Sequence, residues 1–260
     1  MLRILFIGDI VGSSGVKYLK TILPQLCVDE SIDLLLANAE NAAGGLGLTA
    51  SLAKSLHEAG IRIMTLGNHT WSKWEVASLM QADHTVVRPA NGHPDWPGRG
   101  FAVTEVNGRK ICVINLLGSY GMNAPQSPFI MIKDLIADIR ENVPDAHFIV
   151  DMHAEATAEK LAMLAYLDGE VTAVLGTHTH VATADEQVTD NGTAYITDVG
   201  MTGPRDGIIG MSKRSSLRRF VDALPARYEL ADGPCMMNAV LIELDDGGQV
   251  KKIKRVYREE

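Results

Sequence analysis

The sequence predicts an α/β fold with a largely parallel sheet and a mixed part in the middle of the chain. Short apolar runs alternate with amphipathic helical patterns, which is the order of right-handed βαβ crossovers. Asn107-Gly108 lies between two further apolar runs and is a type I′ hairpin signal. The 260 residues are 46% apolar and contain no linker, repeat or low-complexity segment, so we expect residues 1–260 to form one domain.

The first three predicted strands all lead into polar residues. These strands are expected at residues 2–7, 33–37 and 61–66, and the polar residues behind them are Asp9, Glu40, Asn41, Asn68 and His69. Helical patterns follow through residues 18–23, 49–59 and 71–80. Ligands of parallel sheets bind at the carboxyl ends of the strands, so these polar residues are candidates for a common site.

The middle of the chain changes character. Residues 101–106 and 111–115 form the predicted hairpin, which makes the sheet mixed. Residues 117–128 are rich in glycine and proline and are expected to be an irregular loop that reaches over a site at the sheet edge. The apolar stripe of residues 129–142 predicts a helix.

The second half repeats the pattern of polar residues at strand ends. A strand at residues 148–150 leads into Asp151-Met152-His153, and a helix is expected over residues 155–167. The apolar run 171–175 leads into Gly176-Thr177-His178-Thr179-His180. Later strands are expected at 194–197, ending at Asp198, and at 236–244 and 250–257.

Composition excludes several classes of protein. A formal net charge of −8 argues against a duplex DNA partner, since such binding needs a basic surface that displaces counterions. Cys27, Cys112 and Cys235 are far apart and lack CxxC spacing, so neither a disulfide framework nor a zinc ribbon is indicated. No apolar run approaches the ~18–20 residues of a membrane helix, and the N-terminal run is too short for a signal peptide. We therefore expect a cytoplasmic protein with no membrane partner.

The motif at residues 176–180 indicates a metal site, because two histidines one residue apart follow a buried strand. In extended backbone His178 and His180 point to the same side. If the backbone turns after Gly176, the two imidazoles instead reach different ions. The motif implies one or two metals, and the alternative is a hydrogen-bonded pair of loop histidines.

Seven residues at or just past the predicted strand ends offer oxygen or nitrogen ligands. They are Asp9, Glu40, Asn41, Asn68, His153, His178 and His180. Imidazole and carboxylate ligands without thiolate suit manganese, iron or zinc. Seven ligands exceed what one tetrahedral ion takes. They suit two ions ~3.5–4 Å apart, bridged by a carboxylate, that clamp a phosphate ester while a bridging hydroxide attacks in line, with Glu40 as the natural bridge.

The order of these motifs resembles that of the calcineurin-type metallophosphoesterases. Their pattern is a first-strand Asp, a bridging acid, Gly-Asn-His, a later His and a final motif with His-x-His. The chain departs from it with Val11 where a His is usual, and with Glu40-Asn41 where an Asp usually bridges. Both departures are similar to the bacterial YmdB-like branch, whose Asn-x-Glu-Asn-x-x-x-Gly and Asp-x-Gly-Met-x-Gly stretches match residues 38–45 and 198–203.

This resemblance spans nearly the whole chain and implies a four-layer αββα sandwich of the metallo-dependent phosphatase type with two mixed sheets. It implies a dinuclear iron or manganese centre, with zinc as a further candidate, and phosphodiesterase activity toward 2′,3′-cyclic nucleotides. By position, Asp9, Asn41 and His180 would hold the first ion, Asn68, His153 and His178 the second, and Glu40 both.

His69 is then free to act as the catalytic general acid on the departing ribose oxygen, the alternative being a residue that orients a neighbouring ligand.

Several other residues near the strand ends each have two possible roles. Asp151 and Asp198 are either metal ligands or hydrogen-bond partners of the imidazoles. Arg205 is either a phosphate contact or a solvated loop residue. The glycines at 44, 45 and 47 either let backbone amides approach an anion or only form a tight loop.

The leading hypothesis is a metal-dependent phosphoric ester hydrolase, specifically a phosphodiesterase. A phosphomonoesterase or nucleotidase of the same superfamily would use the same metal core. A regulator that binds a nucleotide or an RNA end without turnover is the alternative from another class, and the complete ligand set with His69 argues against it. The expected partner is a small phosphodiester or nucleotide, with RNA ends and a homo-oligomer left open.

Overall fold

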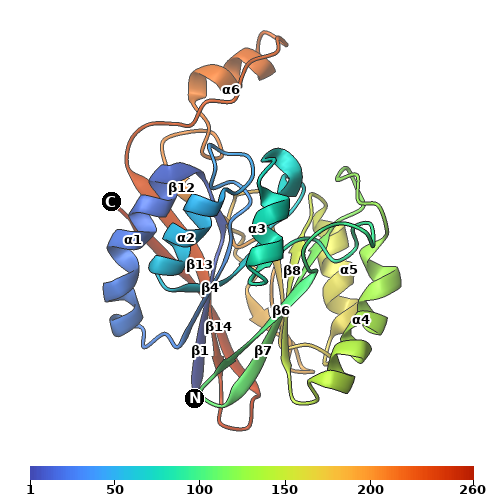
Figure 1. The fold of residues 1–260 in the computed structure, drawn as a ribbon. Coiled ribbons are helices and arrows are strands. Elements are labelled where there is room, and N and C mark those ends of the chain that lie inside the picture. Colours follow the sequence, from blue (N-terminus) through green and yellow to red (C-terminus); the bar gives the residue numbers. More distant parts are fainter.

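Two β-sheets lie face to face in the computed structural model, which describes residues 1–260 (Figure 1). The first sheet contains β1 (Leu2–Ile7), β2 (Asp9–Ile10), β3 (Leu34–Asn38), β4 (Ile61–Thr65), β5 (Val86–Val87), β12 (Met201–Pro204), β13 (Cys235–Leu244) and β14 (Val250–Glu259). The second contains β6 (Phe101–Val106), β7 (Arg109–Leu117), β8 (His147–His153), β9 (Ala173–Thr177), β10 (Gln187–Val188) and β11 (Ala194–Ile196).

Both sheets combine parallel and antiparallel pairs. The first has the order β2-β12-β13-β1-β3-β4-β5 with β14 on β13, and β1 pairs parallel with β3 but antiparallel with β13. The second has the order β10-β11-β9-β8-β7-β6, in which β7, β8 and β9 are parallel and β6 is antiparallel. Parallel strands of both sheets therefore end at a common edge of the molecule, where the candidate ligands follow them.

Helices cover the two outer faces. On the first sheet lie α1 (Gly12–Asp29), α2 (Ala50–Glu58) and α3 (Val76–Ala82), and on the second lie α4 (Pro128–Asn142) and α5 (Thr157–Leu167) (Figure 1). A short helix, α6 (Lys213–Phe220), projects away from the body. The expected four-layer αββα sandwich with two mixed sheets is thus confirmed. None of the helices combines the length and apolar character that a membrane crossing needs.

Three separate apolar layers hold the four structural layers together. Alternate residues of β1 face opposite sides, as the twofold period of a strand requires. Leu5 packs among 27 buried residues under α1, α2 and α3, whereas Phe6 packs among 21 between the two sheets. A third cluster of 16 residues, including Ile132 and Phe148, lies under α4 and α5. The buried runs read from the sequence are therefore buried on both faces.

Most predicted elements are confirmed within a few residues, including the hairpin. Asn107 and Gly108 have φ angles of 50° and 73°, as a type I′ turn requires. The helix expected over residues 71–80 was wrong at its start. The chain forms a 3₁₀ turn, η1 (Thr70–Ser72), and α3 begins only at Val76. Here Trp71 packs edge-on against Trp96, with ring centroids 5.2 Å apart, and tertiary packing overrides the helical pattern.

Candidate metal centre

The predicted ligands come from both sheets and meet at their shared edge. The oxygen donors belong to the first sheet: Asp9 lies in β2, Glu40 and Asn41 follow β3, and Asn68 follows β4. The imidazoles belong to the second sheet: His153 ends β8, and His178 and His180 follow β9. The structure thus brings together all seven residues that the sequence nominated, together with His69.

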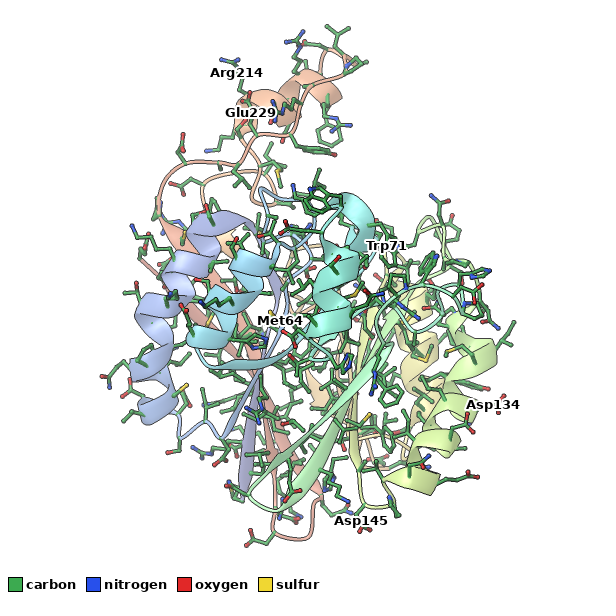
Figure 2. All side chains as sticks on the ribbon, viewed as in Figure 1. Met64, Trp71, Asp134, Asp145, Arg214 and Glu229 are labelled. Carbon is green, nitrogen blue, oxygen red and sulfur yellow. The ribbon has the colours of Figure 1, made fainter.

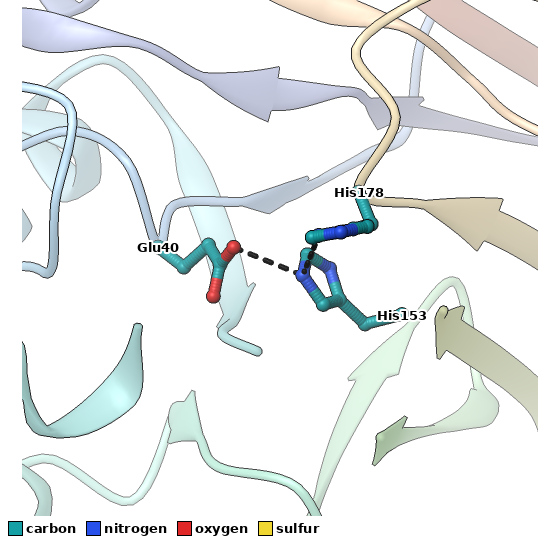
Figure 3. Close-up of side chains that lie close together, drawn as sticks. All are labelled: Glu40, His153 and His178. Carbon is teal, nitrogen blue, oxygen red and sulfur yellow. Dashed lines mark hydrogen bonds and ion pairs between the residues drawn. The ribbon is translucent and has the colours of Figure 1, made fainter. Parts of the chain in front are cut away.

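One group of ligand atoms surrounds Nε2 of His153. Oε1 of Glu40 lies 2.9 Å from this nitrogen, Oδ1 of Asn68 lies 3.0 Å from it, and Nδ1 of His178 lies 3.1 Å from it. Figure 3 shows Glu40 and His178 converging on His153. An imidazole nitrogen carries at most one proton and cannot hydrogen-bond to three acceptors. The ligand atoms of Glu40, His153 and His178 all lie within 4.8 Å of one another, an arrangement that could hold a metal ion.

A second group surrounds Nε2 of His180. This nitrogen lies 3.3 Å from Oδ1 of Asn41 and 3.9 Å from Oδ1 of Asp9. Nδ1 of His180 lies 3.1 Å from the carbonyl oxygen of Ile209, to which it donates, so that Nε2 is left with its lone pair toward the site. Oδ1 of Asp9 is also 3.8 Å from Nδ1 of His153, so the two groups are adjacent.

Two buried carboxylate oxygens give an independent test of metal binding. Oδ1 of Asp9 and Oε1 of Glu40 have no hydrogen-bond donor, although the two residues are only 0% and 1% exposed. Nε2 of His153 lies 2.9 Å from Oε1 of Glu40, an ion-pair contact that requires a protonated ring. A buried, unpaired anionic oxygen is costly unless a cation compensates it. These residues therefore fit a metal centre.

The electrostatics of the shell point the same way. Burial raises the pKa of Asp9 to about 6, against the opposing effect of His180 and His153. Burial alone would lower the pKa of His153, but the Glu40 carboxylate outweighs it and raises that pKa to about 9. The buried carboxylates thus favour a positive charge between them, supplied by a proton or by a bound cation.

The backbone turns between the two motif histidines. His178 and His180 have φ angles of 103° and 66°, a region that residues with side chains rarely adopt. The turn sends His178 to the first group and His180 to the second, which is the geometry expected if the two imidazoles serve different ions. Asp198 holds it: Oδ2 accepts hydrogen bonds from N and Oγ1 of Thr179, at 3.0 and 2.8 Å.

Asp151 and Asp198 are hydrogen-bond partners and do not face either ligand group. Oδ1 of Asp151 accepts a hydrogen bond from Thr177 at 2.6 Å, and Oγ1 of Thr177 lies 2.9 Å from Nδ1 of His153. This chain fixes the orientation of the His153 ring. Asp198 is paired with the buried ammonium of Lys160 at 2.8 Å.

Two residues near the centre were missed by sequence reasoning. Oε2 of Glu155 lies 3.1 Å from Nε2 of His178, so it orients that imidazole with Nδ1 toward the ligand group. Lys160 is 1% exposed and pairs with Asp198, which holds the turn between His178 and His180. An acidic residue two positions after His153 was a weak signal for the first. The second lies in a helical pattern where lysines are usually solvated.

His69 occupies a different position from the ligands. Its backbone N–H donates to Oε2 of Glu40 at 2.9 Å, and its side chain is half-buried and makes no hydrogen bond. Burial lowers the pKa of His69. It lines both a cavity of about 350 Å³ over the centre and a neighbouring one of about 290 Å³. Gly121 and Met122 border the second cavity, so the predicted loop does reach the site.

For Arg205 and the glycines at 44, 45 and 47, the structure favours a structural role over contact with a phosphate. Arg205 forms ion pairs with Asp206 and Glu259 at 3.1 and 3.0 Å on the surface, which favours a solvated residue. The glycines at 44, 45 and 47 have φ angles of 71°, 88° and 81° and form a tight loop. The carbonyl oxygen of Gly45 accepts a hydrogen bond from Nδ2 of Asn41 at 3.0 Å, which leaves Oδ1 of Asn41 toward His180.

Comparison with known proteins agrees with this geometry. The family model described as YmdB-like protein matches residues 5–256. The chain belongs to the YmdB-like family. It is 44% identical over 257 residues to a 2′,3′-cyclic-nucleotide 2′-phosphodiesterase of Bacillus subtilis, a match that covers 99% of this chain and 96% of that protein. Membership of the family makes the chain a hydrolase of the metallophosphoesterase type.

Solved structures of similar proteins share the whole fold. A crystal structure described as a novel phosphatase of Mycoplasma pneumoniae is 36% identical, has a TM-score of 0.91, and covers 99% of this chain and 93% of that one. A hypothetical protein of Thermus thermophilus is 38% identical with a TM-score of 0.91 over 100% of both chains. The 5′-nucleotidase precursor of the same organism, at 12% identity and a TM-score of 0.61, shares the fold alone.

Proposed function

We propose that the protein is a dinuclear metal-dependent phosphodiesterase that hydrolyses 2′,3′-cyclic nucleotides. The observation that carries the proposal is the pair of adjacent ligand groups around His153 and His180, with buried carboxylate oxygens of Asp9 and Glu40 that lack donors. The activity for which the Bacillus subtilis relative is named supports the substrate class. The proposal keeps the expectations of one domain over residues 1–260 and of a cytoplasmic location.

In this proposal Asp9, Asn41 and His180 hold one ion, Asn68, His153 and His178 hold the other, and Glu40 is shared. The donor set of imidazole, carboxylate and amide oxygen suits iron or manganese, and also zinc. Two bound ions would orient the phosphate and lower the pKa of a water nucleophile toward neutrality. Glu155 and Thr177 keep the rings of His178 and His153 in the ligating orientation.

His69 is the proposed general acid. It is one residue past the ligand Asn68, and its side chain borders the cavity over the centre without a hydrogen-bond partner. A protonated imidazole at this position would donate to the departing ribose oxygen. The hydrogen bond from the backbone N–H of His69 to Glu40 fixes the position of the backbone that carries this ring. The cyclic ester bond breaks, and the proton ends on the released ribose hydroxyl.

Metal analysis combined with product analysis tests the proposal. We expect about two transition-metal ions per chain and conversion of adenosine 2′,3′-cyclic phosphate into a single adenosine monophosphate. A phosphomonoesterase would instead release inorganic phosphate from adenosine 2′- and 3′-monophosphates. Less than one ion per chain, with no turnover after addition of Mn²⁺, would contradict the dinuclear phosphodiesterase and favour the binding protein without turnover.

A further inference from the structure

Residues 205–234 form an arm that leaves the first sheet after β12 and returns to it at β13. The arm carries α6 away from the body (Figure 1), and Figure 2 shows Arg214 and Glu229 on it. Antiparallel bridges join Met211 to Ile208 and to Leu230 at the base of the arm. Leu230 packs there with Met211 and Val11. The base is therefore anchored to the body, and with it the backbone of Tyr228, two residues before Leu230.

Tyr228 borders the cavity over the metal centre. The cavity has a volume of about 350 Å³, near the lower end of the ~300–1,000 Å³ typical of small-molecule sites. Its polar lining includes His69, His178 and His180, whereas its apolar lining consists of Leu46, Ile209, Met211 and Tyr228. A phosphate group needs only the polar part. The apolar part fits a flat, uncharged portion of the substrate.

The ring of Tyr228 packs against Arg219, and the residue is partly exposed at the cavity. The guanidinium carbon of Arg219 lies 4.2 Å from the ring centroid, the geometry of a cation–π contact. The tyrosine remains 47% exposed although it lines a cavity. Residues 213–228 carry five basic side chains and one acidic side chain in a protein of net charge −8. The arm is therefore positively charged and attracts an anionic substrate toward the cavity.

We infer that Tyr228 is the residue on which the nucleobase of the substrate stacks, with Arg219 holding the ring in place. The inference rests on the proposed function, because it supplies a site for the part of a nucleotide that the metal centre does not contact. Stacking on an aromatic ring accepts every base, since each base has a π-face. The arm therefore selects nucleotides over phosphodiesters without a base, and it selects weakly among the four bases.

Equilibrium binding tests the stacking role independently of turnover. Calorimetry on the full chain loaded with Mn²⁺ compares adenosine 3′-monophosphate with methyl β-D-ribofuranoside 3-phosphate, which keeps the furanose ring and the phosphate and replaces the base with a methoxy group. The wild type should bind the nucleotide about tenfold or more tightly than the sugar phosphate. Tyr228→Ala should bind both equally, and Tyr228→Phe should restore the preference. Phe220→Ala is the matched control, since Phe220 is an aromatic residue on the same arm that is 80% exposed and does not line the cavity.

Turnover separates this inference from the proposed function. With adenosine 2′,3′-cyclic phosphate, Tyr228→Ala should raise KM with little change in kcat, and a base-free methyl riboside 2′,3′-cyclic phosphate should show no change in KM. A base preference that survives in Tyr228→Ala, or that is absent from the wild type, overturns the stacking role. A base preference in binding without hydrolysis of any cyclic nucleotide supports the stacking role and refutes the proposed phosphodiesterase.

Discussion

The buried ion pair between Lys160 and Asp198 supports the candidate metal centre through Thr179. Lys160→Met tests how much the pair contributes to the free energy of unfolding. The ammonium and carboxylate are 2.8 Å apart, and both side chains are 1% exposed. Removing one partner of a buried pair leaves an uncompensated charge and typically costs ~3–5 kcal/mol. Asp198 keeps hydrogen bonds from Thr179 and Gly200, so we expect the lower end of this range.

Loss of this ion pair should also affect the candidate ligands His178 and His180. Asp198 holds Thr179 between His178 and His180, whose left-handed backbone conformations cost ~1–3 kcal/mol each unless the surroundings impose them. Weakening this anchor lets the turn relax toward a conformation in which the two imidazoles no longer face separate ligand groups. Lys160→Met should therefore retain less metal than the wild type under native conditions.

Urea denaturation measures the stability effect. A loss of ~3 kcal/mol shifts the midpoint by about 1 M if the m-value is ~3 kcal/mol/M. Lys133→Met is the matched control: Lys133 pairs with Glu170 at the same 2.8 Å, but the two side chains are 40% and 39% exposed, and the midpoint should barely move. Lys160→Met combined with Asp198→Asn should recover part of the loss. Equal midpoint shifts in Lys160→Met and Lys133→Met would refute the reasoning.

Three further predictions concern the ligands, the general acid and pH. Glu40→Ala should lose both ions and Asp9→Ala chiefly one, because Glu40 is the proposed bridge; metal analysis of the purified variants compares them, and two ions in Glu40→Ala would remove it from the shell. His69→Ala should keep its metal but lose ~10²–10⁴-fold in turnover of cyclic nucleotides, and much less with nitrophenyl esters, whose leaving group needs little protonation; metal loss with equal slowing of both substrates would contradict the acid role. Burial alone would raise the pKa of Asp185, but hydrogen bonds from Thr183 and Thr197 outweigh it and lower that pKa. The stabilisation of the folded state by this carboxylate is therefore present above pH ~4 and is lost as the pH falls through the lowered pKa. Asp185→Asn should accordingly flatten the acid limb of a stability-against-pH curve, and an unchanged limb would contradict this.

The position of most candidate ligands could be predicted because the ends of buried strands can be recognised in the sequence. Buried apolar runs closed by glycine, asparagine or aspartate locate β1, β3, β4, β8 and β9, and parallel strands place the residues behind them at one edge. That argument needs no side-chain contacts, and it nominated His153 and His180 correctly as neighbours of carboxylates. It could not assign each ligand to an ion, and the resemblance to a family supplied that grouping.

The parts that escaped prediction depend on tertiary contacts. The two-residue strands β2 and β5 carry too little pattern to be recognised. The helix α6 has four basic residues among its eight and lacks an apolar face of ordinary size, so its sequence gives no core-facing stripe. Glu155 and Lys160 act through His178 and Asp198, and only the folded chain brings these pairs together.

The division of the ligands between the two sheets has a consequence for how the sandwich closes. The layer between the sheets is apolar, and hydrophobic burial has no preferred direction, so burial alone would tolerate small sliding of one sheet over the other. Carboxylate and amide oxygens on one sheet and imidazoles on the other accept only one alignment if they are to share an ion. A bound cation would therefore fix the alignment of the two sheets. At a free cation concentration ~100-fold above its Kd, binding to the folded chain alone would add about 2.7 kcal/mol to the free energy of unfolding. Activity and architecture would then depend on the same bonds.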